Sequence, residues 1–285
     1  MTATIDLEVC SRCGLCIRDC IADAIHPETM EIDDDRCIRC SHCSAICPEA
    51  AVLWKNEQGQ VLESGEPLNR LAVETPRNTA DLIKRRRSVR HYRPQALPES
   101  VIKDILVVVN HAPTGTNSRG VGITVVNSMQ RMQELSDLTM RFFRLLSRII
   151  LNPLTIPCIF LCTGRKGLRR LQGYKAHIDR YFRGENNLTH DAPVLFVFHA
   201  DRRSSCPSED AVIWAANAQL YAESLGIGTC YNGFLVRAAA MHRPLRRFLG
   251  IPSHHTVYET FTAGYPAVRY QRTACRDSAY HHIIT

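Results

Sequence analysis

The sequence lacks several features that would assign it to a broad class of protein. Its first residues show no basic segment followed by an apolar core and a small-residue cleavage site, so we expect a cytoplasmic protein. Its most apolar window, residues 145–162, contains Arg148, Asn152 and two prolines, and these interrupt any bilayer span of about 20 apolar residues. No G-x-G-x-x-G turn marks a separate dinucleotide-binding domain.

Lysine is also scarce, because arginine supplies 30 of the 35 basic residues, and the formal net charge is +7. These residues are spread over helical-looking segments, without the RNP signature, zinc finger or basic zipper that accompanies nucleic-acid recognition. We therefore expect no nucleic-acid partner. The basic excess is better explained by binding of an anionic cofactor and by a solvated surface.

Cysteine, in contrast, is abundant, with 13 residues, of which 8 lie between Cys10 and Cys47. Disulfides are rare in the cytoplasm, and an odd number of cysteines cannot pair fully within one chain, so metal or redox chemistry is the leading explanation. Among the five scattered cysteines, we expect Cys158, Cys162 and Cys230 to be buried thiols in apolar strands, the first two within a strand over 156–162.

The charge distribution divides the chain in two. Residues 1–60 carry 11 acidic and 5 basic residues, whereas residues 61–285 carry 17 acidic and 30 basic ones. The stretch 56–80 is rich in Gly, Pro, Glu and Asn without sustained periodicity, which is typical of a connector. We predict a first domain over 1–60, a linker over 61–80 and a second domain over 81–285.

The first eight cysteines form two runs with the pattern C-x2-C-x2-C-x3-C, from Cys10 to Cys20 and from Cys37 to Cys47. In such runs three thiolates bind one iron–sulfur cluster, and the fourth binds the other cluster. Structural zinc, the alternative, uses two pairs of ligands and leaves the third cysteine of each run without a role. The pattern therefore predicts two [4Fe–4S] clusters. The expected ligand sets are Cys10, Cys13, Cys16 and Cys47 for one cluster, and Cys20, Cys37, Cys40 and Cys43 for the other.

Residues 4–55 resemble bacterial two-cluster ferredoxins. The resemblance implies a small domain that carries single electrons. A core of about 55 residues is marginal, so we expect cluster binding to supply much of the folding free energy of this domain.

The second domain begins with the run Arg85-Arg-Arg-Ser-Val-Arg90. Four guanidinium groups and a hydroxyl in six residues suit bidentate phosphate binding, although an isolated run of this kind is also typical of a solvated helix end. Other segments follow in a definite order, namely a helix predicted over 98–110, a loop rich in Pro, Gly and Asn over 111–119, strands over 121–127 and 191–199, and a helix over 211–225 that ends at Gly226.

This ordered set resembles the nitroreductase family of FMN-dependent oxidoreductases, over about residues 81–276. The matching motifs are RRSVR at 86–90, APTGTN at 112–117, ANAQLYAESLGIGTCYNGF at 216–234 and GYP at 264–266. The resemblance implies an α+β fold with a mixed central sheet flanked by helices. It also implies an intertwined homodimer with FMN sites at the subunit interface.

By position in these motifs, the resemblance implies FMN-binding roles for several residues. The phosphate and ribityl chain would be held by Arg86, Arg87, Ser88 and Arg90, with Arg272 and Arg276 as late basic ligands. The loop residues Pro113, Thr114 and Asn117 would lie at the flavin, with Asn117 at the isoalloxazine edge, and the backbone at Asn232 and Gly233 would approach N5. No catalytic acid or base is assigned, because members of this family rely on the flavin for the chemistry.

The two halves together predict an iron–sulfur flavoenzyme. Electrons would pass from a low-potential donor, reduced ferredoxin or NAD(P)H, through the two clusters to FMN, which would reduce a small electron-poor organic acceptor such as a nitroaromatic or conjugated compound. The alternative is an electron-transfer or redox-sensing protein that serves a protein partner without small-molecule turnover, which the charge asymmetry suits. We expect the substrate wall within 128–190, where no residue identifies the substrate.

Two histidine pairs, His254-His255 and His281-His282, stand apart from these motifs. Neither pair has a third ligand at metal-binding spacing in the sequence. We therefore expect both pairs to be surface residues.

Overall fold

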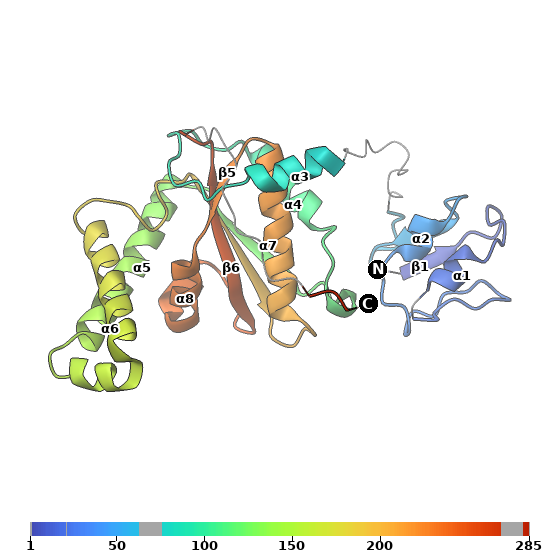
Figure 1. Ribbon diagram of the computed structural model, residues 1–285. Coiled ribbons are helices and arrows are strands. Elements are labelled where there is room, and N and C mark those ends of the chain that lie inside the picture. The colour runs from blue at the N-terminus through green and yellow to red at the C-terminus, as the bar shows by residue number, and fades with distance from the viewer. Residues whose placement is uncertain (1, 21, 63–75, 269–281, 285) are drawn as a thin grey trace. The chain divides into compact units, whose positions relative to one another are not determined.

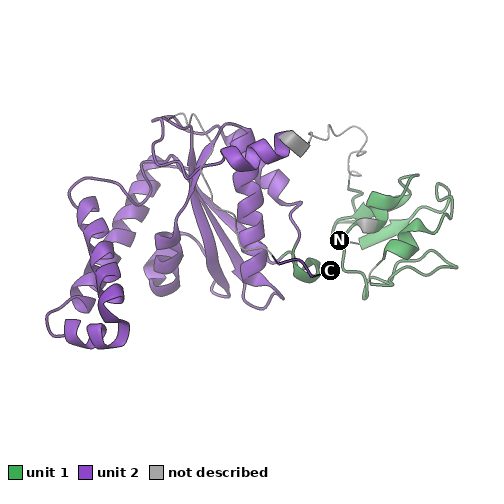
Figure 2. Cartoon of the chain, in the orientation of Figure 1, with its two compact units in different colours: residues 1–75, 114–119 green, residues 76–113, 120–285 purple. Residues whose placement is uncertain are grey.

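The computed structural model describes residues 2–20, 22–62, 76–268 and 282–284 (Figure 1). The chain divides into two compact units. The first comprises residues 1–75 and 114–119, and the second comprises residues 76–113 and 120–285 (Figure 2).

The first unit contains a short two-stranded antiparallel sheet, in which β1 (Thr2–Ile5) pairs with β2 (Val52–Lys55). Two short helices, α1 (Leu15–Asp19) and α2 (His42–Ile46), pack against each other. Its two apolar clusters are small, and cysteine side chains contribute to both of them. A core of this size agrees with the expectation that the unit depends on something other than apolar packing for stability.

The backbone of the two cysteine runs repeats with an offset of 27 residues, the separation between Cys10 and Cys37. Gly14 and Ser41 precede α1 and α2 and have φ angles of 71° and 61°. Arg12 and Arg39 also share a positive φ, at 53° and 56°. Each run therefore turns through the left-handed region at equivalent positions, which directs its cysteines inward from a tight loop.

The second unit is built on a four-stranded sheet with the strand order β3-β4-β6-β5. The strands are β3 (Val121–Val126), β4 (Val194–Asp201), β6 (His255–Gly264) and β5 (Gly228–Tyr231), and each pairs antiparallel with its neighbour. An isolated parallel bridge between Ser88 and Thr229 at the β5 edge gives the sheet its mixed character. The interior strand β4 is buried from Val194 to Ala200.

Helices cover both faces of this sheet (Figure 1). On one face, α4 (Glu99–Val109) and α7 (Pro207–Ser224) enclose a core around Phe196, Phe198 and Phe261. On the other, α5 (Met129–Ile150), α8 (Gly233–Met241) and α9 (Arg243–Phe248) enclose a core with Leu195 and Val197. The remaining helices are α3 (Pro76–Arg85), which precedes the sheet, and α6 (Ile156–Tyr181), which packs on α5.

Alternation along β4 explains this layering, because successive side chains of a strand point to opposite faces of the sheet. An unbroken apolar run is what a strand buried on both faces requires. The predicted helices over 98–110 and 211–225 and the predicted strands over 121–127 and 191–199 are confirmed as α4, α7, β3 and β4.

The prediction of a buried strand over 156–162 is wrong. These residues form the first turns of α6, and Cys158 and Cys162 are exposed on that helix. A short apolar run does not distinguish a strand from a helix, and Pro157 occupies the first turn, where proline favours helix initiation. Cys230, in contrast, is buried in β5 as expected. Among the described residues, none of the helices combines the length and the apolar character needed to cross a bilayer.

Candidate functional site

The residues that follow α3 run along the edge of β5. The backbone N–H of Val89 donates to the carbonyl of Thr229 at 2.9 Å, next to the parallel bridge at Ser88. Gly228 permits this close approach, because a Cβ there would lie 2.7 Å from Cγ2 of Val89. The backbone of the arginine–serine run is thus fixed by the sheet, while its side chains keep access to solvent. Those of Arg86, Arg87 and Ser88 are half-buried, and Arg90 is exposed.

The GYP motif holds the next part of the same segment. The N–H of Arg93 donates to the Tyr265 carbonyl at 2.8 Å, and Ala267 donates to the His91 carbonyl at 2.8 Å. A side chain at Gly264 would lie 2.6 Å from the ring of Pro193, so glycine is needed for this packing. The motif therefore fixes the chain directly after the arginine–serine run.

Polar groups gather around Arg90. Burial raises the pKa of the Cys230 thiol, while Arg90 and a hydrogen bond with Ser88 act in the opposite direction. Burial and the positive charge of Arg90 lower the pKa of His190 to about 4. The structure thus brings Ser88, Arg90, Cys230 and His190 together. Sequence reasoning missed His190, because nothing in the local pattern links it to a run 100 residues earlier.

Asn232 caps α8. Its Oδ1 accepts from the Leu235 N–H at 3.2 Å, and its Nδ2 donates to the Leu188 carbonyl at 2.7 Å. Its backbone N–H donates to Thr260 at 2.8 Å. Both polar atoms of the Asn232 side chain are therefore bonded within the protein. The groups that can still bind a ligand are the backbone N–H groups in the first turn of α8, at Gly233, because the first N–H groups of a helix have no acceptor within it.

The loop residues are divided between the two units. Pro113 belongs to the second unit, whereas Thr114 and Asn117 belong to the first. There the Asn117 amide donates to the Ile38 carbonyl at 2.7 Å, and the Thr114 hydroxyl accepts from the Arg119 N–H at 3.0 Å. The predicted ligands Arg272 and Arg276 lie outside the described residues.

A cavity of about 220 Å³ lies between α5, α6 and α8, beside Phe234. The ring centroid of Phe234 is 5.3 Å from that of Phe143, 5.5 Å from that of Tyr174 and 4.9 Å from that of His177. Leucine and isoleucine side chains, Met241 and Ser147 form the rest of the wall, and Lys175 and Arg237 supply positive charge. The cavity therefore suits a small, largely apolar molecule with an electron-poor or anionic group.

Tyr174 is the polar centre of this cavity. Its hydroxyl accepts from Arg237 at 3.2 Å and from Arg170 at 2.8 Å, and these bonds lower the pKa of Tyr174. The predicted substrate wall over 128–190 supplies α5 and α6 to the cavity. No sequence pattern indicated Tyr174 or Arg237, because their proximity depends on how α6 packs against α8.

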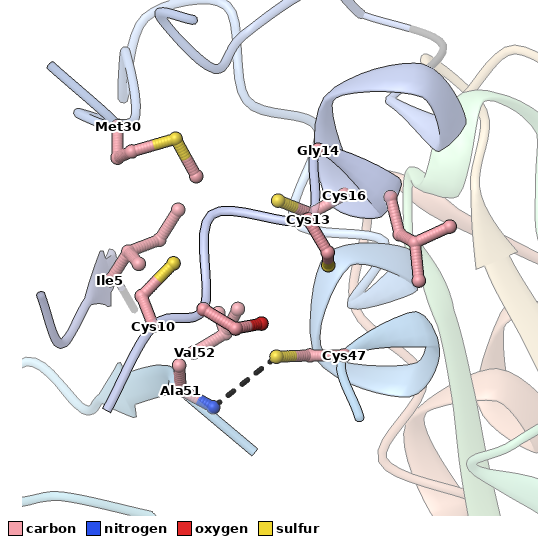
Figure 3. Close-up of a pocket in the computed structure, with 11 residues that line it drawn as sticks. Ile5, Cys10, Cys13, Gly14, Cys16, Met30, Cys47, Ala51 and Val52 are labelled. Atoms are coloured by element: carbon pink, nitrogen blue, oxygen red, sulfur yellow. Dashed lines mark hydrogen bonds between the residues drawn. The ribbon is translucent and has the colours of Figure 1, made fainter. Parts of the chain in front are cut away.

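The cysteines of the first unit line two separate hollows. Figure 3 shows the first, where the side chains of Cys10, Cys13, Cys16 and Cys47 surround a common space with Ile5 and Met30. The second is lined by Cys20, Cys37, Cys40 and Cys43 with Ile25, Ile32 and Trp54. The spacing of the cysteines in the sequence groups them in the same two sets.

Backbone N–H groups point at several of these sulfurs. The N–H of Ala24 donates to Cys20 Sγ and that of Ala51 to Cys47 Sγ, each at 3.3 Å. Burial and neighbouring thiols raise the pKa of the Cys43 thiol to about 11. Several thiolates so close together require a positive charge among them, which is the property of a metal-binding donor set.

One histidine pair differs from expectation. His254 and His255 do have a third potential ligand, because an oxygen of Asp201 and one nitrogen of each histidine lie within 4.8 Å of one another. Asp201 is more than 50 residues earlier in the sequence, and only the pairing of β4 with β6 brings it there. Of the other pair, His282 is exposed and His281 lies outside the described residues.

The sequence profile of the Nitroreductase family matches residues 83–265, which include the arginine–serine run, the residues that line the cavity and the first two residues of the GYP motif. The chain belongs to the nitroreductase family. As a member of it, the chain is an FMN-dependent oxidoreductase. A comparison with curated proteins finds no significant match.

Solved structures of nitroreductases share the fold of the second unit. A nitroreductase with bound FMN from Bacteroides fragilis NCTC 9343 has a TM-score of 0.52 and 20% identity, covering 72% of this chain and 98% of its own. An FMN-dependent nitroreductase from Clostridium difficile R20291 has a TM-score of 0.53 and 19% identity, covering 73% and 100%. An iodotyrosine deiodinase bound to FMN and 3-iodo-L-tyrosine has a TM-score of 0.52 and 16% identity, covering 73% and 99%.

Proposed function

We propose that this nitroreductase-family enzyme carries a ferredoxin-like N-terminal domain over 1–60, joined by a linker over 61–80 to the FMN domain over 81–285. Two [4Fe–4S] clusters in the first domain would feed electrons to FMN in the second, for reduction of a small electron-poor organic acceptor. The observation that carries the proposal is the presence, in one chain, of two cysteine-lined hollows and a family match over 83–265.

The FMN phosphate is assigned to the arginine–serine run. Arg86, Arg87, Ser88 and Arg90 offer guanidinium and hydroxyl donors on a backbone held at the β5 edge, which favours a bidentate, charge-assisted hold on phosphate. The N-terminus of α8 at Gly233 adds backbone donors for the flavin ring. Bound FMN would supply both one-electron and two-electron chemistry, including hydride delivery from N5.

The clusters are assigned to the two cysteine sets. Four sulfurs around each hollow, with N–H groups directed at Cys20 and Cys47, match the ligands and hydrogen bonds that [4Fe–4S] clusters require. Cysteine ligation of iron also agrees with a cytoplasmic location, because thiols stay reduced there.

The acceptor is assigned to the cavity beside Phe234. Gly233 and Phe234 are consecutive residues, so the cavity adjoins the backbone assigned to flavin N5. Aromatic edges at Phe143 and Tyr174 suit a planar ring, and Arg237 stabilises negative charge that develops on the acceptor as it is reduced.

The donor is proposed to be reduced ferredoxin or another low-potential reductant, with NAD(P)H as the second choice. A homodimer is also proposed. It is supported by the large apolar side chains that α5 and α6 leave exposed, namely Leu145, Ile149, Phe160 and Leu161.

Anaerobic purification with iron, sulfide and flavin quantitation tests the cofactors. We expect about eight iron atoms and one FMN per chain, with about half of the iron lost in Cys43→Ser. Cys158→Ser, which removes an exposed thiol on α6, is the matched control and should retain all of it. Iron content unaffected by Cys43→Ser would contradict the ligand assignment.

A second experiment tests the electron path. Reduced ferredoxin should bleach the cluster absorption and then the flavin bands in the complete protein, and acceptor turnover should follow. Full-rate turnover with NADPH while the clusters remain oxidised would refute the path from clusters to flavin.

An electron-transfer or redox-sensing protein without small-molecule turnover is the second candidate. The observation in its favour is the charge contrast between residues 1–60, with 11 acidic and 5 basic residues, and residues 61–285, with 17 and 30, which suits docking to a protein partner. Saturable turnover of a purified nitroaromatic or conjugated acceptor would exclude it.

A further inference from the structure

The far end of the sheet holds a cluster of metal-ligand side chains. Asp201 ends β4, and His255 begins β6 directly opposite it in the strand register. His199 lies two residues before Asp201, on the same face of β4. Val194 is aligned through Ala263 with Thr229, at the β5 edge assigned to the FMN phosphate. Asp201 is seven residues further along β4, about 23 Å at the usual rise of a strand, so the cluster is separate from that edge.

Chain contacts hold this cluster in place. The guanidinium of Arg246 donates to the carbonyls of Pro252 at 3.2 Å and His255 at 2.8 Å. The Arg202 side chain donates to Ser253 at 3.1 Å, and its backbone N–H donates to His254 at 3.2 Å. The turn that presents both histidines is therefore anchored to β4 and to α9 before any ligand binds, which lowers the entropic cost of binding.

His199 completes the arrangement from inside the protein. It is 6% exposed, and its Nδ1 lies 2.8 Å from Nδ1 of His255, while its Nε2 lies 3.3 Å from the Thr124 hydroxyl. Gly122 leaves room for this imidazole, because a Cβ there would lie 2.4 Å from Cε1 of His199. The hydrogen bonds between His255 and His199 and between His199 and Thr124 fix the ring orientations. The first uses Nδ1 of His255, so its Nε2 is the nitrogen that faces a ligand.

We propose that Asp201, His254 and His255 bind a divalent transition metal ion of the zinc class, with His199 as the residue that orients His255. Two imidazole nitrogens and one carboxylate oxygen are ligands that zinc takes, with water in the fourth position of a tetrahedral site. The ligand atoms lie within 4.8 Å of one another, and a tetrahedral zinc ion needs them about 3.3 Å apart, which side-chain rotation supplies. A ligating histidine commonly donates its other N–H to a fixed acceptor, the role that His199 takes here.

Arg203 competes with this ion for the Asp201 carboxylate. Its guanidinium binds the Asp201 carboxylate, with Nη2 at 2.7 Å from Oδ2 and Nε at 3.0 Å from Oδ1. The Arg203 side chain is 78% exposed, so it can turn into solvent when a metal takes its place. Metal binding thus exchanges an exposed ion pair, which contributes little to stability, for coordinate bonds.

The test uses the complete protein with its clusters and FMN, passed over a chelating resin and titrated anaerobically with zinc chloride in equilibrium dialysis. We expect one zinc ion per chain, and nitrogen or oxygen neighbours at about 2.0–2.1 Å in X-ray absorption at the zinc edge. His255→Ala and Asp201→Asn should each weaken binding by at least about tenfold, whereas His282→Ala, at an exposed histidine, should not. Sulfur neighbours at about 2.3 Å, or unchanged affinity in both ligand variants, would overturn the proposal.

Three further variants separate ligand loss from misfolding. Arg203→Ala should tighten zinc binding several-fold, because it removes the cation that competes for Asp201. Misfolding of the variant would weaken zinc binding, so tighter binding distinguishes the two. Thr124→Val should weaken binding by about tenfold, and Thr124→Ser, which keeps the hydroxyl, should restore it. Equal or weaker binding in Arg203→Ala, or weak binding in both Thr124 variants, would contradict the assignment.

Discussion

The side chain of Asn232 is tied to the carbonyl oxygen of Leu188, 44 residues earlier, by a hydrogen bond of 2.7 Å. The same amide caps α8 through its oxygen. One buried side chain therefore joins the start of α8 to the segment that leads into β4. This bond fixes the helix terminus that we assign to the flavin.

Asn232→Ala removes both interactions and should lower the free energy of unfolding by about 2 kcal/mol, the sum expected for a lost cap and an unpaired buried carbonyl. Asn232→Ser can keep a capping oxygen but has no group that reaches Leu188, so its free energy of unfolding should fall between those of wild type and Asn232→Ala. Urea denaturation measures all three. Asn217→Ala, at an exposed position on α7, is the control and should change stability by less than about 0.5 kcal/mol.

Gly228→Ala should weaken FMN binding by about tenfold or more. The added Cβ would lie 2.7 Å from Val89 and 2.9 Å from Pro266, so the segment with Ser88 and Arg90 must move from the β5 edge. Flavin fluorescence on titration of the apoprotein gives the Kd. Gly173→Ala, in α6 with nothing within 4 Å of the added carbon, should leave the Kd unchanged. Equal FMN affinity in wild type and Gly228→Ala would contradict the placement of the phosphate.

Phe234→Leu should raise KM for an aromatic acceptor by about tenfold while FMN content stays the same. The substitution removes the ring of Phe234 from the cavity wall, and an aromatic contact between this ring and the acceptor is worth about 0.5–1.5 kcal/mol. Steady-state kinetics with a nitroaromatic series measures the effect. Phe160→Leu, at an exposed position of α6, is the matched control. A similar KM in both variants would place the acceptor elsewhere.

The stability of the second unit should fall as the pH falls from about 6.5 towards 4. Burial and Arg90 lower the pKa of His190 from 6.5 to about 4, so the unfolded chain binds a proton that the folded chain rejects in this window. The stability that neutral His190 contributes is fully present above the pKa of the unfolded chain, about 6.5, and is lost as the pH falls towards 4. His177 shifts in the same direction, so the comparison must be with a variant.

Urea denaturation of wild type and His190→Gln at several pH values between about 7 and 5 isolates this contribution. We expect a shallower decline in the variant, because glutamine cannot take up the proton. Parallel curves for the two proteins would show that His190 does not titrate in this way.

Local sequence determined several elements of the fold. An unbroken apolar run predicted β4, and a helical pattern ending at Gly226, whose φ is 74°, predicted the end of α7. The spacing of the first eight cysteines separated them into the two sets that line the two hollows. Such features depend on residues within a few turns of one another, where sterics and periodicity decide the conformation.

Tertiary packing decided the rest. The apolar run at 156–162 became helix, and the approach of Asp201 to His255 required β4 and β6 to pair across more than 50 residues. The hydrogen bond from the Asn232 amide to Leu188 depends on the same long-range packing. The sequence alone specified which chemical groups the chain carries and the local turns that present them. Which distant groups meet was decided only by the folded sheet, because strand register and helix packing set those distances.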